Sequence, residues 1–199
     1  MVDRRSMAET QFYPTQIERD NDEKRNEAGL INAAKDDSSA FGILYQRYVQ
    51  SVYKYFLNRT WNRSIAEDLT AQTFLAALEN FHRYRDNGHF TAWLFTIARR
   101  KAADHFRRNH RENTELDTDL LFYKTDFLQD IAQREMIHEI GKLFETLCEK
   151  DKELIRLRYV ATLPYREIAV ILRKSEGAVK KATYRLIARM KKDLEIKYE

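Results

Sequence analysis

Two stretches of the sequence combine basic and aromatic side chains, and these residues have the types and spacing that could do chemistry. Residues 90–108 read FTAWLFTIARRKAADHFRR, and residues 163–186 read LPYREIAVILRKSEGAVKKATYRL. Arginine and lysine grip phosphates, and aromatic rings stack on unpaired bases. A charge run is most often a solvated helix face. The pairing of basic with aromatic residues favours nucleic-acid binding.

An enzyme active site finds little support. His105 and His110 lie near Asp104, but their spacing fits no metal-ligand pattern. The single cysteine, Cys148, has no CxxC partner, so we expect it to be a small buried apolar residue. The chain has no P-loop, dinucleotide fingerprint or nucleophile elbow. We therefore expect no enzyme activity, no metal and no cofactor.

The composition predicts an all-α protein. Hydrophobic residues make up 43% of the 199 residues, so a core can form, and the net charge of +4 permits a polyanionic partner. Only five Gly and two Pro occur, and no long strand-like alternation is present. No apolar run approaches the roughly 20 residues that span a bilayer. We expect a cytoplasmic protein without membrane insertion.

The N-terminal half predicts a disordered arm, residues 1–27, followed by one short helix and three longer ones. A short helix is expected at 28–35, followed by a long one that Asp37, Ser38 or Ser39 caps. After a turn at 61–63, the sequence SIAE from Ser64 predicts a capping box for the next helix. The apolar side of the long helix includes Tyr45, and that of the helix after Ser64 includes Leu78. The loop 82–89 contains Asn87-Gly88, a turn signal, and the helix 90–108 follows.

In helix 90–108, apolar and basic residues fall on opposite sides when successive residues are placed 100° apart around the helix axis. The apolar side is a core face and includes Phe90, Leu94, Phe95, Ile97, Ala98, Ala102 and Phe106. The other side carries Arg99, Arg100 and Arg107 beside Ala92 and Ala103. This side predicts a flat, positive strip beside the loop RYRDNGHF.

The C-terminal half predicts a helix-turn-helix after an acidic linker, residues 110–130. Helices are expected at 131–149 and 151–163, then a short helix 165–172, a turn at 173–175 and a basic helix that Ser175 caps. Apolar residues can pack the last two helices together: Ile168, Ala169, Leu172, Val179 and Leu186. Lys180, Lys181, Tyr184 and Arg185 would then face a DNA major groove, with Arg166 in reach. The alternative is an ordinary basic hairpin.

The order of these elements resembles the extracytoplasmic-function (ECF) group of the sigma-70 family of RNA polymerase sigma factors. The matching segments are AFGILYQRYVQSVYKYF, AEDLTAQTFLAAL and FTAWLFTIARRKAADHFRR, then LPYREIAVIL and SEGAVKK. The resemblance implies two small helical domains joined by a flexible linker: region 2 at 28–109 and the helix-turn-helix of region 4 at 131–199. It also implies a promoter-specificity subunit that binds promoter DNA and the clamp helices and flap of core RNA polymerase. An anti-sigma partner and association with the nucleoid when active are further implications.

The resemblance also implies residue roles. Polymerase contacts are expected at Glu67, Asp68 and Gln72. Contacts to the minus-ten element are expected at Arg83, Tyr84, Arg85, Asn87, His89, Phe90, Trp93, Arg99, Arg100 and Arg107. Contacts to the minus-thirty-five element are expected at Arg166, Ser175, Glu176, Lys180, Lys181, Tyr184 and Arg185.

Two other functions remain as alternatives to a sigma factor. A helix-turn-helix regulator would use only the C-terminal half and would leave AEDLTAQTFLAAL without a role. A decoy that titrates an inhibitor would not need Arg99, Arg100, Lys180 or Arg185. The acidic linker, from Glu112 to Asp130, would suit a basic polymerase channel, or it is a solvated tether.

Overall fold

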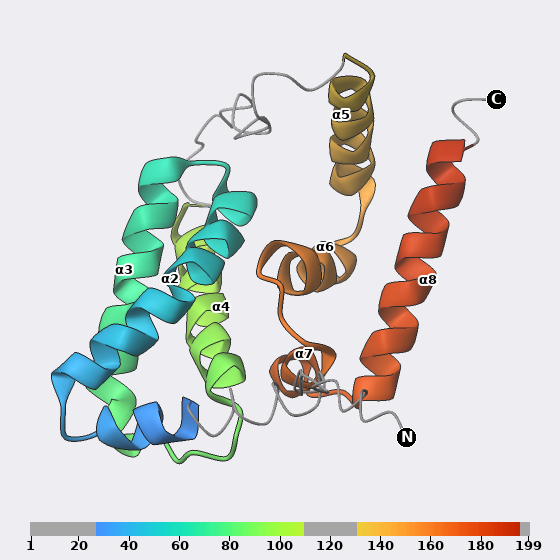
Figure 1. The fold of residues 1–199 in the computed structure, drawn as a ribbon. Helices are drawn as coiled ribbons and strands as arrows, with labels where there is room; N and C mark the ends of the chain where they lie inside the picture. The colour runs from blue at the N-terminus through green and yellow to red at the C-terminus, as the bar shows by residue number, and fades with distance from the viewer. Residues whose placement is uncertain (1–26, 110–130, 196–199) are drawn as a thin grey trace, which may run out of the picture.

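Only helices and the turns between them make up residues 27–109 and 131–195, the part of the chain that this computed structural model describes (Figure 1). The N-terminal domain contains a helical turn at 27–33, α2 (Ser38–Thr60), α3 (Arg63–Asn80), the short 3₁₀ helix η1 (Phe81–Arg83) and α4 (Phe90–Asn109). The expected all-α class is confirmed. The expected arm and linker lie outside the described residues, and the domain boundaries stay a prediction.

The C-terminal domain contains α5 (Ile131–Thr146), α6 (Glu149–Ile155), η3 (Arg156–Val160), α7 (Tyr165–Leu172) and α8 (Glu176–Glu195). The single helix expected at 151–163 begins as α6 and widens into the π-helical turn η3. In that turn the Ala161 amide donates to the Arg156 carbonyl oxygen over 2.8 Å, five residues back. Cys148 precedes α6 and is exposed, so the expectation that it would be buried is wrong.

The helix starts follow capping chemistry, with one departure from the sequence prediction. The Asp37 carboxylate accepts the Ser39 amide over 2.8 Å and caps α2, as expected. At α3 the cap is Asn62, whose side chain accepts the Ile65 amide over 3.0 Å. The capping box predicted at Ser64 is therefore wrong. Asn62 holds the extended backbone that a cap needs, whereas Ser64 already lies inside the first turn.

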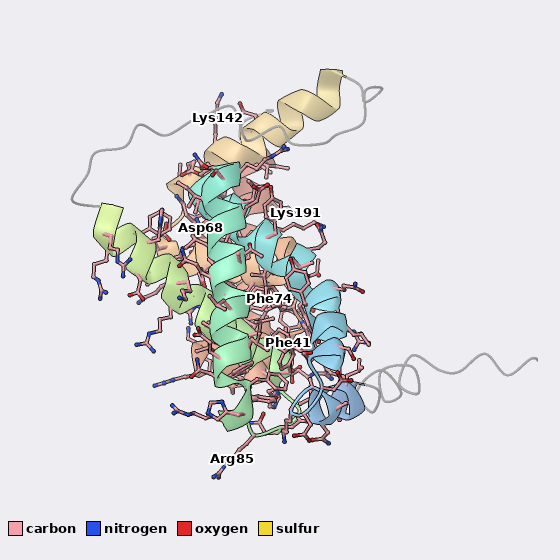
Figure 2. The ribbon with its side chains drawn as sticks, turned by 90° about the vertical axis from the view of Figure 1, so that its left-hand side faces the viewer. Phe41, Asp68, Phe74, Arg85, Lys142 and Lys191 are labelled. Atoms are coloured by element: carbon pink, nitrogen blue, oxygen red, sulfur yellow. The ribbon has the colours of Figure 1, made fainter. Side chains whose placement is uncertain are left out.

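Aromatic and aliphatic side chains from α2, α3 and α4 fill the N-terminal core. Tyr55, Phe56 and Phe95 are fully buried, and Figure 2 shows Phe41 and Phe74 between α2 and α3. Burying a side chain of this size contributes roughly 1.5–3 kcal/mol. Three residues predicted on the apolar sides are instead exposed, namely Tyr45, Leu78 and Phe106. Helical spacing locates a broad apolar face but does not tell which of its edges a neighbouring helix covers.

The helix-turn-helix forms as the sequence predicted. Ile168, Val179 and Leu186 are buried between α7 and α8. Arg173 closes α7 with a left-handed backbone, φ 53°. The Ser175 hydroxyl accepts the Ala178 amide over 3.2 Å and begins α8.

The two domains are in direct contact. Helix α4 packs against α7, and α2 packs against η3, while α8 lies on the side of the C-terminal domain away from α3 (Figure 1). The contact joins segments far apart in the sequence, and it brings side chains of both predicted DNA-binding elements to one interface.

Candidate nucleic-acid interface

The loop before α4 is held open by a local hydrogen-bond network around one carboxylate. The Asp86 Oδ1 atom accepts the Gly88 amide over 2.9 Å and the Tyr84 hydroxyl over 3.3 Å. Gly88 has φ 75°, a conformation that a side chain would strain, so glycine suits the turn. Arg83, Arg85 and Asn87 consequently project from the loop and are exposed.

Below this loop lies an aromatic cluster that supports it from the core. Tyr84 and Phe90 were expected to contact DNA, but both are buried, at 6% and 2% exposure. Their rings lie 4.7 Å and 5.6 Å from that of Trp93, centroid to centroid. Trp93 is half-buried. Of the three rings, Trp93 is therefore placed to meet a ligand, and the other two fix its position.

A groove of about 510 Å³ runs between α3 and α4, and its lining is mainly basic and amphipathic. Arg83, Trp93 and Arg100, three of the residues expected to contact the minus-ten element, line it. Lys101 and Asn80 also line it and were missed. Asp104 adds one negative charge to the groove lining, and its carboxylate pairs with Arg107 over 3.0 Å. Cations beside an indole ring can bind a single strand through its phosphates and one stacked base.

Arg99 does not join Arg100 in this groove. Its Nε atom lies 2.7 Å from Glu153 Oε1 in α6, and its Nη1 atom donates to the Ile171 carbonyl oxygen over 3.2 Å. Ala92, expected to border the basic strip, is buried at 1% exposure. The continuous positive strip predicted for α4 is therefore wrong here, because the C-terminal domain covers half of it.

Glu153 is the centre of a buried charge cluster between the domains. Besides Arg99, its carboxylate contacts Arg59 Nη1 at 2.6 Å and accepts the Tyr55 hydroxyl at 3.1 Å. Glu153 itself is 5% exposed. Burial and the Glu153 charge raise the pKa of Tyr55 above its ordinary value, so its hydroxyl stays a donor. Tyr55, Arg59 and Arg99 all belong to the N-terminal domain.

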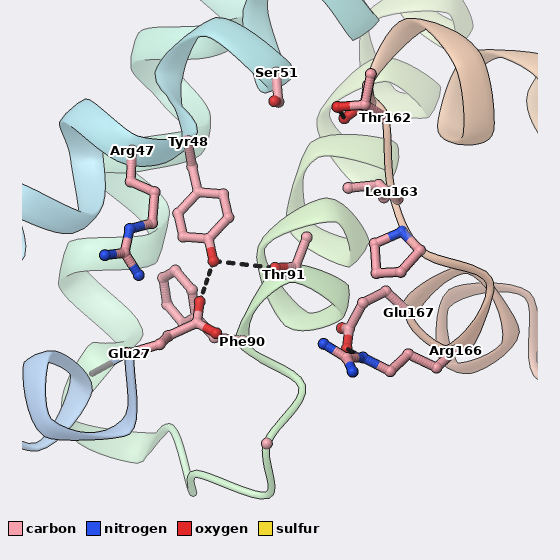
Figure 3. Close-up of a pocket in the computed structure, with 13 residues that line it drawn as sticks. Glu27, Arg47, Tyr48, Ser51, Phe90, Thr91, Thr162, Leu163, Arg166 and Glu167 are labelled. Carbon is pink, nitrogen blue, oxygen red and sulfur yellow. Dashed lines mark hydrogen bonds and ion pairs between the residues drawn. The ribbon is translucent and has the colours of Figure 1, made fainter. Parts of the chain in front are cut away.

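A second buried carboxylate, Glu167, meets the start of α4. Its Oε2 atom accepts the Ala92 amide over 3.0 Å, and its Oε1 atom lies 3.0 Å from His89 Nδ1. Both Glu167 and Arg166 line a cleft of about 440 Å³ between the domains, opposite Tyr48 and Thr91 (Figure 3). Arg166, expected near the minus-thirty-five element, thus faces this cleft in the present arrangement.

The remaining residues expected to read the minus-thirty-five element form one exposed face. Ser175, Glu176, Lys180, Lys181, Tyr184 and Arg185 are all exposed along the start of α8. Lys180 pairs with Glu176 over 2.8 Å, and this contact raises the pKa of its ammonium group. Tyr184 is 65% exposed, although its ring lies 6.3 Å from that of Tyr165, centroid to centroid.

The expected polymerase contacts lie on the outer face of α3. Asp68 and Gln72 are one turn apart, and the Gln72 amide donates to the Asp68 carboxylate over 2.7 Å. Glu67 is exposed beside them. Leu75, 58% exposed, continues the same face and was missed by the sequence analysis. Figure 2 shows Asp68 toward one end of α3 and Arg85 in the loop beyond the other end, so the two surfaces are separate.

Comparison with known proteins identifies both halves. The family Sigma-70 region 2 matches residues 44–112, and the family Sigma-70, region 4 matches residues 137–190. The ECF RNA polymerase sigma factor SigM of Bacillus subtilis is 31% identical over 150 residues, which cover 74% of this chain and 91% of SigM. BldN of Streptomyces coelicolor, also an ECF RNA polymerase sigma factor, is 31% identical over 177 residues, which cover 84% of this chain and 65% of BldN.

The fold has a solved counterpart as well. The structure of the sigma factor RpoE in complex with the anti-sigma factor NepR from Bartonella quintana matches with a TM-score of 0.61 and 19% identity, over 78% of this chain and 97% of that one. A sigma factor fold with regions 2 and 4 is thus present. The chain belongs to the sigma-70 family of RNA polymerase sigma factors, in its ECF group.

Family membership decides between a sigma factor and a helix-turn-helix regulator that acts alone. A sigma factor is a promoter-specificity subunit of RNA polymerase, which starts transcription without doing the chemistry itself. A helix-turn-helix regulator that acts alone would not carry region 2, which matches here. Within residues 27–109 and 131–195, no helix is long and apolar enough to cross a membrane.

Proposed function

We propose that the two domains divide promoter recognition, with the α3–α4 groove holding the minus-ten element and the α8 face reading the minus-thirty-five element. The observation that carries this division is the groove itself, where Arg83, Arg100 and Lys101 surround the indole of Trp93. Such a lining suits a single strand rather than a duplex, because it offers one stacking surface and phosphate contacts along one side. The exposed face of α8 suits a major groove instead.

Polymerase docking is assigned to the outer face of α3. Glu67, Asp68 and Gln72 supply polar contacts, and Leu75 supplies an apolar one that is 58% exposed in the free chain. A mixed surface of this kind is typical of an interface that forms and dissociates. The C-terminal domain would bind the polymerase flap.

The test is transcription with core RNA polymerase from a promoter library, on duplex templates and on templates already melted at the minus-ten element. Loss of Arg100 should impair strand opening, and a pre-melted template should partly restore transcription. Loss of Lys181 should reduce binding to duplex promoters, and pre-melting should not help. If pre-melting restores the Lys181 variant and not the Arg100 variant, the division of roles is wrong.

Control by an anti-sigma partner is part of the same proposal. The fold matches that of RpoE, which was solved in complex with the anti-sigma factor NepR. Purification of the chain from its own cells tests this directly. Full promoter activity in unstressed cells with no co-purifying protein would contradict it, whereas recruitment to the nucleoid on release from a partner is the expected behaviour.

A further inference from the structure

We propose that the cleft of about 440 Å³ between the domains binds a small phosphate monoester whose organic part carries hydroxyl groups, such as a sugar phosphate. The cleft lies between α2 and the start of α4 on one side and the segment from η3 into α7 on the other (Figure 3). Its volume falls within the range of about 300–1,000 Å³ that small-molecule sites occupy. The cleft is separate from the α3–α4 groove and the α8 face, so the inference does not depend on the proposed division of promoter recognition.

Two arginines from opposite walls supply the positive charge that a phosphate needs. Figure 3 shows Arg47 on the α2 side and Arg166 at the start of α7. The Arg166 Nε atom is buried and lies 3.4 Å from Glu167 Oε1, but no hydrogen bond forms between them. The Arg166 side chain as a whole is 38% exposed, so its guanidinium has an unused donor and room to turn. Guanidinium groups bind phosphate oxygens through paired N–H donors.

The two carboxylates in the lining are engaged by other groups of the protein. Glu27 accepts the Tyr48 hydroxyl, and Glu167 accepts the Ala92 amide over 3.0 Å. Arg47 is exposed, and in Figure 3 no hydrogen bond or ion pair joins it to another residue of the lining. The negative charges of the cleft therefore serve neighbouring donors, while the charge of Arg47 stays open to a ligand.

Three hydroxyl groups line the cleft and suit the organic part of the ligand. Thr91 donates to the Tyr48 hydroxyl over 3.3 Å, and Thr162 donates to the Ala161 carbonyl oxygen over 2.8 Å. Because both threonines have donated their protons, their hydroxyl oxygens act toward a ligand as acceptors. Ser51 adds a third hydroxyl. Such acceptors favour a ligand with O–H donors of its own, which a sugar has.

Thr162 is held in a backbone conformation that β-branched residues rarely adopt. Its φ is 58°, in the left-handed region. Both neighbours are fixed, because the Ala161 amide donates to the Arg156 carbonyl oxygen over 2.8 Å and the Leu163 amide to the Leu157 carbonyl oxygen over 2.9 Å. Backbone strain of this kind clusters at ligand-binding sites. Here it places Thr162 in the lining of the cleft.

Isothermal titration calorimetry of the full chain with ribose 5-phosphate, ribose and inorganic phosphate tests the site. Ribose 5-phosphate should bind with a Kd of about 1 mM or tighter, and ribose should not bind measurably. Inorganic phosphate should bind more weakly than ribose 5-phosphate, because it lacks the organic hydroxyl groups. The proposal is overturned if ribose 5-phosphate does not bind, or if either of the other two compounds binds as tightly.

Charge variants locate the binding. Arg47→Gln with Arg166→Gln should weaken the binding of ribose 5-phosphate at least about tenfold. The control, Arg108→Gln with Lys191→Gln, makes the same change of charge at exposed positions outside the cleft lining and should leave the Kd unchanged. Glu27→Gln should tighten binding, because it removes a negative charge and keeps an acceptor oxygen. A control that binds as weakly as the cleft variant contradicts the site, and so does weaker binding by Glu27→Gln.

Thr162→Gly separates the loss of a ligand contact from the loss of the fold. Glycine adopts the left-handed backbone without strain, so the melting temperature should not fall. The binding of ribose 5-phosphate should weaken roughly two- to tenfold, because one hydroxyl is lost. Unchanged binding would show that the ligand does not contact this wall of the cleft, against the proposal.

Nucleic acid also supplies phosphates, so a labelled mixed-sequence single-stranded 20-mer is titrated in parallel by fluorescence anisotropy. Arg47→Gln with Arg166→Gln should affect ribose 5-phosphate more strongly than the strand. If this variant weakens the strand and leaves ribose 5-phosphate unchanged, the cleft takes nucleic-acid phosphates and the proposal is wrong. Circular dichroism checks that all variants keep their helices.

Discussion

The salt dependence of single-strand binding gives a quantitative test of the α3–α4 groove. Three cations line it, Arg83, Arg100 and Lys101. Each phosphate contact on a single strand contributes a slope of about −0.7 to the logarithm of the binding constant against the logarithm of salt concentration. Three contacts give a slope of about −2.1, and Arg100→Ala should reduce it to about −1.4.

This change in slope translates into a measurable change in affinity. Between 50 and 200 mM salt, the wild type should lose affinity by about 18-fold and Arg100→Ala by about sevenfold. Fluorescence anisotropy with a labelled single strand measures both values across a salt series. Lys142→Ala is the matched control, since Lys142 lies on α5 and pairs with Glu139 over 3.1 Å. An Arg100→Ala slope equal to that of Lys142→Ala would refute the assignment of this groove to the strand.

Three further predictions concern other surfaces. Leu75→Glu should weaken binding to core polymerase at least tenfold without lowering the melting temperature, because Leu75 is 58% exposed; a pull-down series and a thermal melt check both points. Arg185→Ala should relax promoter specificity at one base pair, at a cost of about 1–3 kcal/mol, and a binding assay across single-base promoter variants should locate that base pair. Ser175→Ala should lower the free energy of unfolding by about 1 kcal/mol through loss of the α8 cap, measured by urea denaturation; no change in the unfolding midpoint would show that the Ala178 amide finds another acceptor.

Local sequence patterns were sufficient for most of the fold. The α7–turn–α8 unit follows from the spacing of Ile168, Val179 and Leu186 and from Ser175 as a cap, which are all short-range signals. The start of α4 at Phe90 likewise follows from the Asn87-Gly88 turn. Helix periodicity and capping depend on neighbours within a few residues, so a single sequence contains the information.

The domain contact could not be predicted in the same way. Glu153 lies in an ordinary charged helix sequence, and its partners Arg59 and Arg99 are 94 and 54 residues away. Periodicity placed Arg99 on the same face as Arg107 but could not show that another domain would cover it. The burial of Tyr84 was missed for a related reason, because a loop aromatic can point inward as readily as outward, whereas the burial of Phe90 agrees with its place on the apolar side of helix 90–108. Long-range pairing decides both cases.

The wide turn η3 sets the direction in which Glu153 points relative to Glu167, the two carboxylates at the contact between the domains. Glu153 precedes the turn and Glu167 follows it, and the Leu163 amide ties the outgoing chain back to the Leu157 carbonyl oxygen over 2.9 Å. Loss of one residue from η3 would restore ordinary α-helical winding and rotate one side against the other by about 100°. Glu153 and Glu167 would then point in different directions. Within this fold, the length of one turn determines whether a single rigid domain can present both charges to the same surface.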